Sequence, residues 1–339
     1  MFAWQINQPK QLKKVSIVNN LEQINDVKVK ITKCLITRQD LLNFLGKSNA
    51  TLPIIPSNIA VGQIVETLEE SNYFAKGTKV YLAHEKPCNT CYKCLNNLSE
   101  ECLNILHASR DFEGYLKEFA VVPKESAHIL TQKTSYYDAL FLKHISLALS
   151  VIDKLKIEKG QHVCILGGSI FANILAQLIS YYQGVPILID NCQNNLDIAN
   201  KCGIYYTYPV TKNLEKQILN ITGGRKCSKI IYDTECDINS DWISKLCANK
   251  ASVAITGMIE TKTKVNFELL FEKEVTFTCI KSSIENIASG INLIVQGVLN
   301  LTCFDINEYK FDYADKHFEN FANKLLNDSD KNEFIIDLM

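Results

Sequence analysis

Glycine is scarce in this chain, and neither sign of charge is in excess. The 339 residues include 14 glycines, whereas an average protein of this length has roughly 24. Lys and Arg number 36 against 37 Asp and Glu, which leaves a formal charge of −1. Because a nucleic-acid-binding protein usually presents a strongly basic surface to the phosphates, this balance predicts no nucleic-acid partner.

The chain also lacks a segment that could cross a membrane or serve as a secretory signal. Its best candidate for a span, residues 284–301, contains Glu285, Asn286 and Gln296, whereas a span needs about 20 mainly apolar residues. The first 30 residues have no uninterrupted apolar stretch. Low-complexity tracts and internal repeats are absent too. We therefore expect a soluble, cytoplasmic protein with no membrane partner.

What is present indicates two globular domains. With 47% hydrophobic and 22% charged residues the chain can bury a sizeable core, and its length is about twice that of one usual domain. Short apolar runs between polar or Gly/Pro breakers predict β-structure for the first 130 residues. The expected strands include 27–31, 61–65 and 79–82, and one helix is expected at 38–45.

From about residue 137 apolar strands alternate with amphipathic helices. Such alternation is typical of a doubly wound α/β domain, in which helices cover both faces of a parallel sheet. The expected strands are 162–166, 186–190, 229–232 and 252–256, and the expected helices are 139–155, 170–183, 195–202 and 238–249. Beyond residue 281 we expect helices at 284–298 and 312–326 and a strand at 334–338.

Four of the 13 cysteines are clustered in the segment PCNTCYKCLNNLSEEC. Cys88, Cys91, Cys94 and Cys102 have the spacing C-x2-C-x2-C-x7-C. Four thiolates in one loop can surround a tetrahedral ion, so the spacing predicts one structural zinc. An iron–sulfur cluster could use the same ligands. A chance cluster or a pair of disulfides would also be compatible with the spacing, and a reducing cytoplasm counts against disulfides.

The remaining cysteines are scattered through predicted strands and helices. We interpret them as reduced side chains that fill the core. They are Cys34, Cys164, Cys192, Cys202, Cys227, Cys236, Cys247, Cys279 and Cys303.

The turn after the predicted strand 162–166 has features of a dinucleotide-binding fingerprint. The fingerprint requires Gly, Gly and Gly or Ala at its first, third and sixth positions, where this chain has Gly167, Ser169 and Ala172. Ser169 is the departure, because it adds a side chain where backbone approaches the pyrophosphate, although its hydroxyl can donate to a phosphate. Asp190 ends the next strand, where an acid binds the ribose hydroxyls and repels a 2′-phosphate. The turn predicts NAD(H) in preference to NADP(H), and the alternative is a nucleotide fold that no longer binds nucleotide.

In the order of these parts the whole chain resembles the zinc-containing alcohol and polyol dehydrogenases of the medium-chain dehydrogenase/reductase superfamily. The four-cysteine lobe, the segment EGYLKEFAVVP, the turn at Gly167, Asp190 and the segment ITG (255–257) carry the resemblance. It implies a GroES-like β domain at 1–140 and 281–339 with a zinc lobe at 86–104, and a Rossmann domain at 141–280. It also implies an active site in the cleft between them, a small-molecule substrate and a homodimer or homotetramer.

Members of this family hold a second, catalytic zinc, and the resemblance implies that its ligands are replaced here. Segment 37–40 aligns with the CGTD motif and has Thr37 at the cysteine ligand and Gln39 at the proton-relay hydroxyl. Segment 53–62 aligns with P-x-x-x-GHE-x-x-G and has Ser57, Asn58 and Ile59 at the Gly, His and Glu. Thr, Asn and Ile supply neither the thiolate nor the imidazole that such a zinc site needs.

A further ligand position, a Glu in the linking helix of the family, is Lys143 here, followed by His144. His144 would point about 100° away around the helix, and Cys34 precedes Thr37 at a strand end that aims it elsewhere. We therefore expect neither residue to rebuild the zinc site.

Three functions remain open at this point. The first is an NAD(H)-dependent oxidoreductase that acts on a small alcohol, carbonyl or enone without a catalytic zinc, with its altered site at Lys143, Thr37 and Asn58. In this function Lys143 polarises the carbonyl, and Tyr115 and Arg38 are further donors.

The second is a catalytically degenerate dehydrogenase that acts as a nucleotide-binding or interaction protein. The third is an ordinary zinc enzyme whose alignment is shifted locally. Asp40 and Gly62, which the family motifs share with this chain, count against such a shift.

Overall fold

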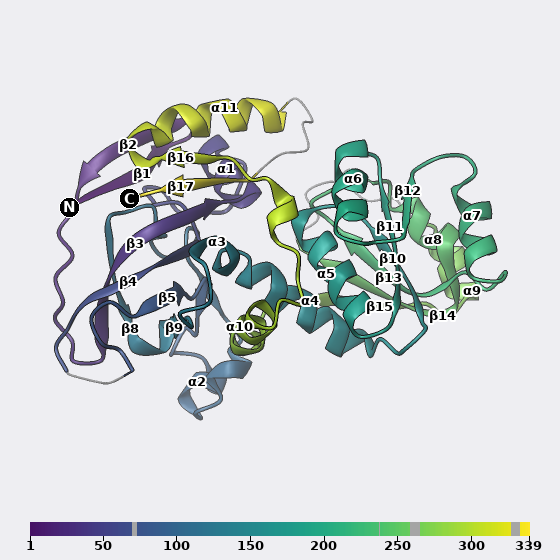
Figure 1. The fold of residues 1–339 in the computed structure, drawn as a ribbon, viewed down its shortest axis with the longest axis horizontal. Helices are drawn as coiled ribbons and strands as arrows, with labels where there is room; N and C mark the ends of the chain where they lie inside the picture. Colours follow the sequence, from purple (N-terminus) through teal and green to yellow (C-terminus); the bar gives the residue numbers. More distant parts are fainter. Residues whose placement is uncertain (70–72, 237, 258–264, 327–332) are drawn as a thin grey trace. The chain divides into compact units, whose positions relative to one another are not determined.

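The computed structural model describes residues 1–69, 73–236, 238–257, 265–326 and 333–339. The chain forms two compact units (Figure 1). The first unit combines Met1–Phe141 with Ile306–Met339, and the second unit is Leu142–Asp305.

A seven-stranded sheet forms the centre of the first unit. The order is β16-β17-β3-β4-β5-β9, β8 also pairs with β3, and all pairs except β16 with β17 are antiparallel. Along β3, Val27, Val29 and Ile31 are buried between more exposed residues, as a half-buried strand requires. The strands are β3 (Asp26–Ile36), β4 (Ile59–Thr67), β5 (Lys79–Leu82), β8 (Phe119–Pro123), β9 (Ala127–Ile129), β16 (Glu308–Lys310) and β17 (Phe334–Asp337).

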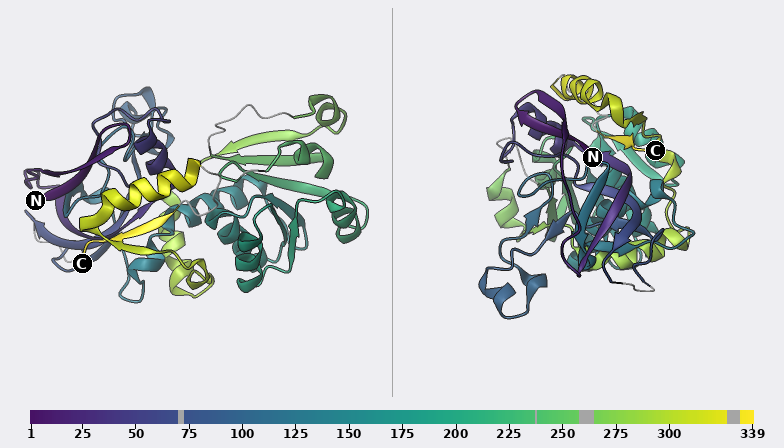
Figure 2. Two further views of the ribbon diagram at one scale, coloured as in Figure 1. Left: turned by 90° about the horizontal axis from the view of Figure 1, so that it is seen from above. Right: turned by 90° about the vertical axis from the view of Figure 1, so that its left-hand side faces the viewer.

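The end of the chain completes the core of this unit. Besides α1 (Arg38–Leu45) and α3 (Tyr136–Ala139), the unit contains α11 (Ala314–Leu326), which Figure 2 shows in yellow beside the hairpin of β1 (Phe2–Gln8) and β2 (Gln11–Ser16). The buried Phe318 of α11 lies 5.8 Å from Phe44 of α1 and 5.7 Å from Phe334 of β17, measured between ring centroids. These aromatic contacts anchor the C-terminal segment to the β domain.

The second unit contains a six-stranded parallel sheet in the order β12-β11-β10-β13-β14-β15. The strands are β10 (His162–Leu166), β11 (Val185–Asp190), β12 (Tyr206–Pro209), β13 (Cys227–Asp233), β14 (Cys247–Thr256) and β15 (Thr276–Ile280). The helices are α4 (Leu142–Leu155), α5 (Ile170–Tyr181), α6 (Gln193–Lys201), α7 (Leu214–Ile221), α8 (Asp241–Leu246), α9 (Phe267–Glu272) and α10 (Ile287–Val295). Within the described ranges, no helix is long and apolar enough to cross a bilayer.

The fold class predicted from the sequence is confirmed, and several boundaries differ. The helix expected at 238–249 is only the short α8, because Cys247 already pairs with Cys227 at the start of β14. No element is predicted in 203–228, where the structure has β12 and α7. The strand at 79–82 and the helix at 38–45 coincide with β5 and α1.

The segment 281–305, expected in the β domain, belongs to the second unit. Ser146 of α4 donates its hydroxyl to Ser283 O and accepts from Ser283 N–H at 3.1 Å. Gln177 of α5 accepts from Asn300 N–H at 2.7 Å, and α10 packs on α4. These contacts place the return to the first unit at Ile306 rather than near Lys281.

Cys202 and Cys303 form a disulfide, which corrects the interpretation that all cysteines outside the cluster are reduced core residues. Cys202 follows α6, and Cys303 lies in the 3-10 turn Thr302–Phe304. Cys279 is exposed, so it does not fill the core either. Cys34, Cys164, Cys227 and Cys247 are buried, as expected.

Candidate functional site

The four clustered cysteines lie in a lobe that a short hairpin closes. β6 (Glu85–Lys86) pairs with β7 (Leu106–His107) at its base, and α2 (Tyr92–Leu95) begins directly after Cys91. Asn89 and Asn97 adopt φ of 58° and 60°, a conformation that asparagine tolerates better than most residues. These turns bring the ligand atoms of Cys88, Cys91, Cys94 and Cys102 within 4.8 Å of one another.

The sulfur positions fit one tetrahedral metal ion. Sulfurs at about 2.3 Å from a central zinc lie about 3.8 Å apart. Here the Sγ–Sγ distances are 3.5 Å for Cys91–Cys94 and for Cys88–Cys102, 3.9 Å for Cys91–Cys102 and 4.0 Å for Cys88–Cys94. Hydrogen bonds from Thr90 lower the pKa of Cys88 to about 6, which favours the thiolate that binds metal. In the part of the chain that the structure describes, this is the one such cluster of His, Cys, Asp or Glu.

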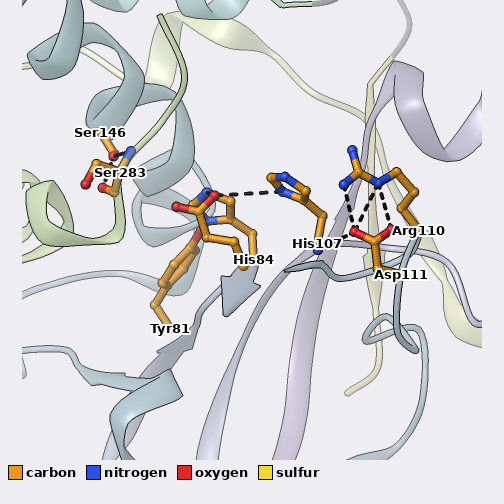
Figure 3. A network of polar contacts seen from close by, with 8 residues as sticks. Tyr81, His84, His107, Arg110, Asp111, Ser146 and Ser283 are labelled. Atoms are coloured by element: carbon orange, nitrogen blue, oxygen red, sulfur yellow. Dashed lines mark hydrogen bonds and ion pairs between the residues drawn. The ribbon is translucent and has the colours of Figure 1, made fainter. Parts of the chain in front are cut away.

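At the base of the lobe, His84 and His107, both labelled in Figure 3, lie near the carboxylate of the buried Glu85. Glu85 Oε2 is 3.9 Å from His84 Nε2 and 3.8 Å from His107 Nδ1. The other ring nitrogen of His84 lies 3.2 Å from the hydroxyl of Tyr81 in β5. These contacts connect β6 and β7 of the lobe's hairpin with β5 of the sheet. The sequence around the two histidines does not indicate such a role.

Asp40 connects the two segments that the family resemblance aligns with the catalytic-zinc motifs. Its carboxylate is fully buried and accepts hydrogen bonds from Thr37 N–H and Thr37 Oγ1, both at 3.0 Å. It also accepts from Ser57 N–H and Ser109 Oγ, both at 2.7 Å. Since a hydroxyl has one proton, the Thr37 hydroxyl donates to Asp40 and not to a substrate.

Ser57 adopts a backbone conformation for which glycine is the usual residue. Its φ is +70°, and its Oγ lies 2.9 Å from Ile59 O and 3.2 Å from Leu35 O. Ser57 and its two predecessors also pack their carbonyls against Gly114, where a Cβ would lie 2.4 to 2.6 Å from them. The glycine of EGYLKEF is therefore required for this close approach.

Asn58 is buried, and its Oδ1 has no hydrogen-bond partner among the described residues. Gln39, at the position of the proton-relay hydroxyl, donates to Asn43 Oδ1 in its own helix at 3.0 Å. Lys143 is half-buried and is the second residue of α4 in the second unit, whereas Thr37 and Asn58 belong to the first unit.

Tyr115 is not an available donor, contrary to the expectation from the sequence. It is buried and donates its hydroxyl to Ala83 O at 2.7 Å, and burial raises its pKa. The segment contributes a buried lysine instead, because Lys117 is 6% exposed and its ammonium lies 3.2 Å from Glu113. Burial lowers the pKa of Lys117. No spacing rule would have distinguished this lysine from a surface residue.

The glycine turn between β10 and α5 is packed against two acidic side chains. Gly167 has φ of +127°, and a Cβ there would lie 2.6 Å from the Cβ of Asp233. A Cβ on Gly168 would lie 2.6 Å from Asp190 Oδ2. Ala172 is fully buried in the first turn of α5, as close packing of helix on sheet requires.

The Ser169 hydroxyl already acts both as a hydrogen-bond donor and as an acceptor within the protein. Ser169 is the N-cap of α5; its Oγ accepts from Ala172 N–H at 3.2 Å and donates to Asp233 Oδ2. Asp233 ends β13 and is 1% exposed, and burial raises its pKa. Asp233 is not among the residues predicted from the sequence, although an acid at the carboxyl end of a predicted strand was the available signal.

Asp190 ends β11, where a ribose-binding acid is expected. It is 4% exposed, its Oδ1 accepts from Cys192 N–H at 2.6 Å, and its Oδ2 lies 3.4 Å from Asn195 Nδ2. These bonds hold the carboxylate beside Gly168. The glycine turn and the helix start lie where a pyrophosphate is expected in this type of fold, and Asp190 lies where a ribose is expected, whereas the Ser169–Asp233 pair alters the donors at the phosphate position.

Residues 23–132 match the alcohol dehydrogenase GroES-like domain family. The chain is 22% identical to an uncharacterized zinc-type alcohol dehydrogenase-like protein of Haemophilus influenzae, over 81% of this chain and 82% of that protein. It is 20% identical to a sorbitol dehydrogenase of Halalkalibacterium halodurans, over 87% and 88%.

Solved structures share the fold over the whole chain. A short chain alcohol dehydrogenase of Escherichia coli in complex with NADH has a TM-score of 0.86 at 17% identity and covers 100% of this chain and 99% of its own. A protein of Sinorhizobium meliloti, proposed to be a zinc-binding dehydrogenase and bound to NADP, has a TM-score of 0.85 at 16% identity, with 99% of both chains covered.

The chain therefore combines a match to the alcohol dehydrogenase GroES-like domain with a separate parallel-sheet unit. Together these matches show a GroES-like domain in residues 23–132 and the fold of solved dehydrogenase structures over the whole chain, in line with the resemblance to the medium-chain dehydrogenase/reductase superfamily.

Proposed function

We propose that the protein is an NAD(H)-dependent oxidoreductase that acts on a small alcohol, carbonyl or enone without a catalytic zinc. The observation that carries the proposal is a contrast within one fold. Gly167 lies in the tight turn and Asp190 at the strand end where a dinucleotide is expected in this type of fold, which supports the proposal. The positions that align with the catalytic-zinc ligands are Thr37 and Asn58, which lack the ligand chemistry of that metal.

The cluster of four cysteines supports a structural metal ion rather than a catalytic one. Cys88, Cys91, Cys94 and Cys102 would hold one zinc, and all four positions on the ion would be filled by protein. Such an ion braces the lobe but has no open position for water or substrate. The residues at the former catalytic positions do not fit a second zinc, so no step of the reaction is assigned to one.

The reduction of a carbonyl then depends on side chains. Gly167, Ser169 and Asp190 would hold the NADH, whose chemistry is the donation of a hydride to a carbonyl carbon, and the carbonyl oxygen would have to receive a proton as negative charge develops on it. We propose that the Lys143 ammonium holds that proton and stabilises the oxygen. For Asn58 the proposal of a contact with substrate rests on its motif position in the sequence alone. Thr37 supports Asn58 indirectly, because Asp40 binds both Thr37 and the neighbouring Ser57.

The preference for NAD(H) over NADP(H) is part of the proposal. Its basis is Asp190, whose carboxylate beside Gly168 would repel a 2′-phosphate. By analogy with the zinc-type and polyol dehydrogenases that the chain resembles, we further propose a homodimer or homotetramer. The proposal of a cytoplasmic location rests on the sequence alone, and the Cys202–Cys303 disulfide is unusual for that compartment.

Two experiments test the proposed function. The zinc-loaded chain is titrated with NADH and with NADPH, and nicotinamide fluorescence reports binding. The Kd for NADH should be lower than the Kd for NADPH. A panel of alcohols, carbonyls and enones should then give turnover that Lys143→Met lowers by about 100-fold or more, the usual effect of removing a preorganised donor. Lys154→Met, an exposed lysine of the same helix, is the matched control.

Binding of NADH with no turnover on the panel would favour the second function, a degenerate dehydrogenase that binds nucleotide. A specific observation supports that alternative, because buried carboxylates already engage the hydroxyls of Thr37 and Ser169. Unchanged turnover in Lys143→Met would remove Lys143 from the mechanism.

A further inference from the structure

The N-terminus of α5 is the place where a dinucleotide presents its pyrophosphate in this type of fold. In this chain the same place contains an internal acid. Asp233 Oδ2 accepts the proton of the Ser169 hydroxyl, and Asp233 Oδ1 accepts the Glu235 N–H at 3.1 Å. The Asp233 side chain also lies directly against Gly167.

In this arrangement the Ser169 hydroxyl and the Ala172 N–H, which could donate to a phosphate, already donate to acceptors within the protein. Ser169 has one hydroxyl proton, which Asp233 accepts, and its oxygen accepts the N–H of Ala172 from the first turn of α5. An incoming pyrophosphate would therefore meet a hydroxyl that cannot donate. It would also approach a buried carboxylate, and repulsion between like charges is strong where water is excluded.

The surroundings of Asp233 favour its neutral form. The acid Asp190 faces it from β11, the loop after β13 contributes Glu235 and Cys236, and Ser169 is the group that faces it from the start of α5. Helix α5 itself has no charged residue. Desolvation by burial, together with the charge of Asp190, raises the pKa of Asp233.

Protonation would reverse the hydrogen bond. A neutral Asp233 carries a hydroxyl proton on Oδ2 that it can donate to Ser169 Oγ. Ser169 would still accept from Ala172 N–H, and its own proton would become available to a phosphate oxygen. One proton taken from solvent thus removes the repulsion and creates a phosphate donor in the same step.

We propose that Asp233 couples the binding of NAD(H) to the uptake of one proton, so that the anionic dinucleotide binds the form in which Asp233 is neutral. The inference rests on the proposed function, since it concerns the same nucleotide site. It makes Asp233 a positioning and affinity-determining residue that acts through Ser169. The affinity for NADH falls as pH rises, by at most about tenfold per pH unit for one proton.

The test is a titration of the zinc-loaded full chain with NADH at pH 6, 7, 8 and 9, with calorimetry in two buffers of different ionisation enthalpy. The wild type should take up a proton on binding, approaching one per NADH as pH rises, and its Kd should increase with pH. Asp233→Asn should show a Kd that does not depend on pH, no proton uptake, and about tenfold or tighter binding than the wild type at pH 9. Glu268→Gln, which removes an exposed acid of the same unit, should behave as the wild type.

Each further outcome has one meaning. A wild-type Kd that is constant over this pH range, without proton uptake, overturns the inference and leaves the proposed function intact; this measurement needs no variant, so it stands even if Asp233→Asn does not fold. Proton uptake that persists in Asp233→Asn assigns the proton to another group and also overturns it. Failure of both proteins to bind NADH at every pH overturns the proposed function, and the inference with it.

Discussion

Replacement of Asp40 by asparagine is expected to destabilise the first unit by about 3 to 5 kcal/mol. The buried carboxylate accepts hydrogen bonds from Thr37 N–H and Thr37 Oγ1 on one oxygen, and from Ser57 N–H and Ser109 Oγ on the other. Asparagine keeps one of these oxygens and places an NH2 group at the other position. One buried backbone N–H, of Thr37 or of Ser57, is then left without an acceptor.

The magnitude follows from this count of bonds. A buried donor without an acceptor costs about 1–3 kcal/mol, and a hydrogen bond to a charged group contributes about 1.5–3 kcal/mol. The hydroxyls can rotate to other partners, but the backbone N–H cannot. The control is Asp312→Asn, because Asp312 is 72% exposed in its ion pair with Lys14, and such surface pairs contribute about 0–1 kcal/mol.

The two tryptophans allow the first unit to be measured separately. Trp4 is buried in the first unit and Trp242 lies in the second, and the sequence has 2 tryptophans. In a Trp242→Phe background, urea unfolding followed by tryptophan fluorescence reports the free energy of unfolding around Trp4. A loss below about 1 kcal/mol for Asp40→Asn would refute the role assigned to its carboxylate.

Three further perturbations test other parts of the structure. Ser57→Gly should be more stable than Ser57→Ala by about 1 kcal/mol in urea unfolding, because both lose the hydroxyl and only glycine relieves the positive φ; the reverse order would contradict this. Burial lowers the pKa of His128, so the unfolded chain takes up its proton first as pH falls below about 6.5, and the first unit should lose stability from pH 7 towards pH 5. The loss should be smaller in His128→Gln, and equal pH profiles would refute the assignment. Reduction of Cys202–Cys303, which are 101 residues apart, should destabilise the second unit by up to roughly 5 kcal/mol, and peptide mass mapping after alkylation without reductant should find neither of these cysteines alkylated.

Much of the fold could be predicted because it depends on local patterns. The apolar strand at 162–166 followed by a glycine turn and an amphipathic helix reappears as β10 and α5. Likewise, the helix at 38–45 begins after Thr37, with Asp40 three residues later, a pattern that is typical of a helix N-terminus. The boundary at Ile306 could not be predicted, because it depends on contacts such as Gln177 with Asn300 that join distant parts of the chain.

In the candidate site, too, features that depend on a local pattern could be predicted, and features that depend on contacts between distant segments could not. The spacing of the four cysteines predicts their cluster, since all four lie in one loop. The role of Asp233 depends on two strand ends that are neighbours only in the folded sheet, because β10 pairs with β13. Ser169 is recognisable as a departure from the fingerprint, but its partner is not, and the partner determines what its hydroxyl does.

The number of zinc ions per chain tests the central claim most directly. Protein purified without chelator, measured by plasma mass spectrometry, should contain one zinc per chain, and Cys102→Ser should contain much less. Two zinc ions per chain in the wild type, one of which remains in Cys102→Ser, would contradict the claim that the positions of Thr37 and Asn58 do not bind a catalytic zinc.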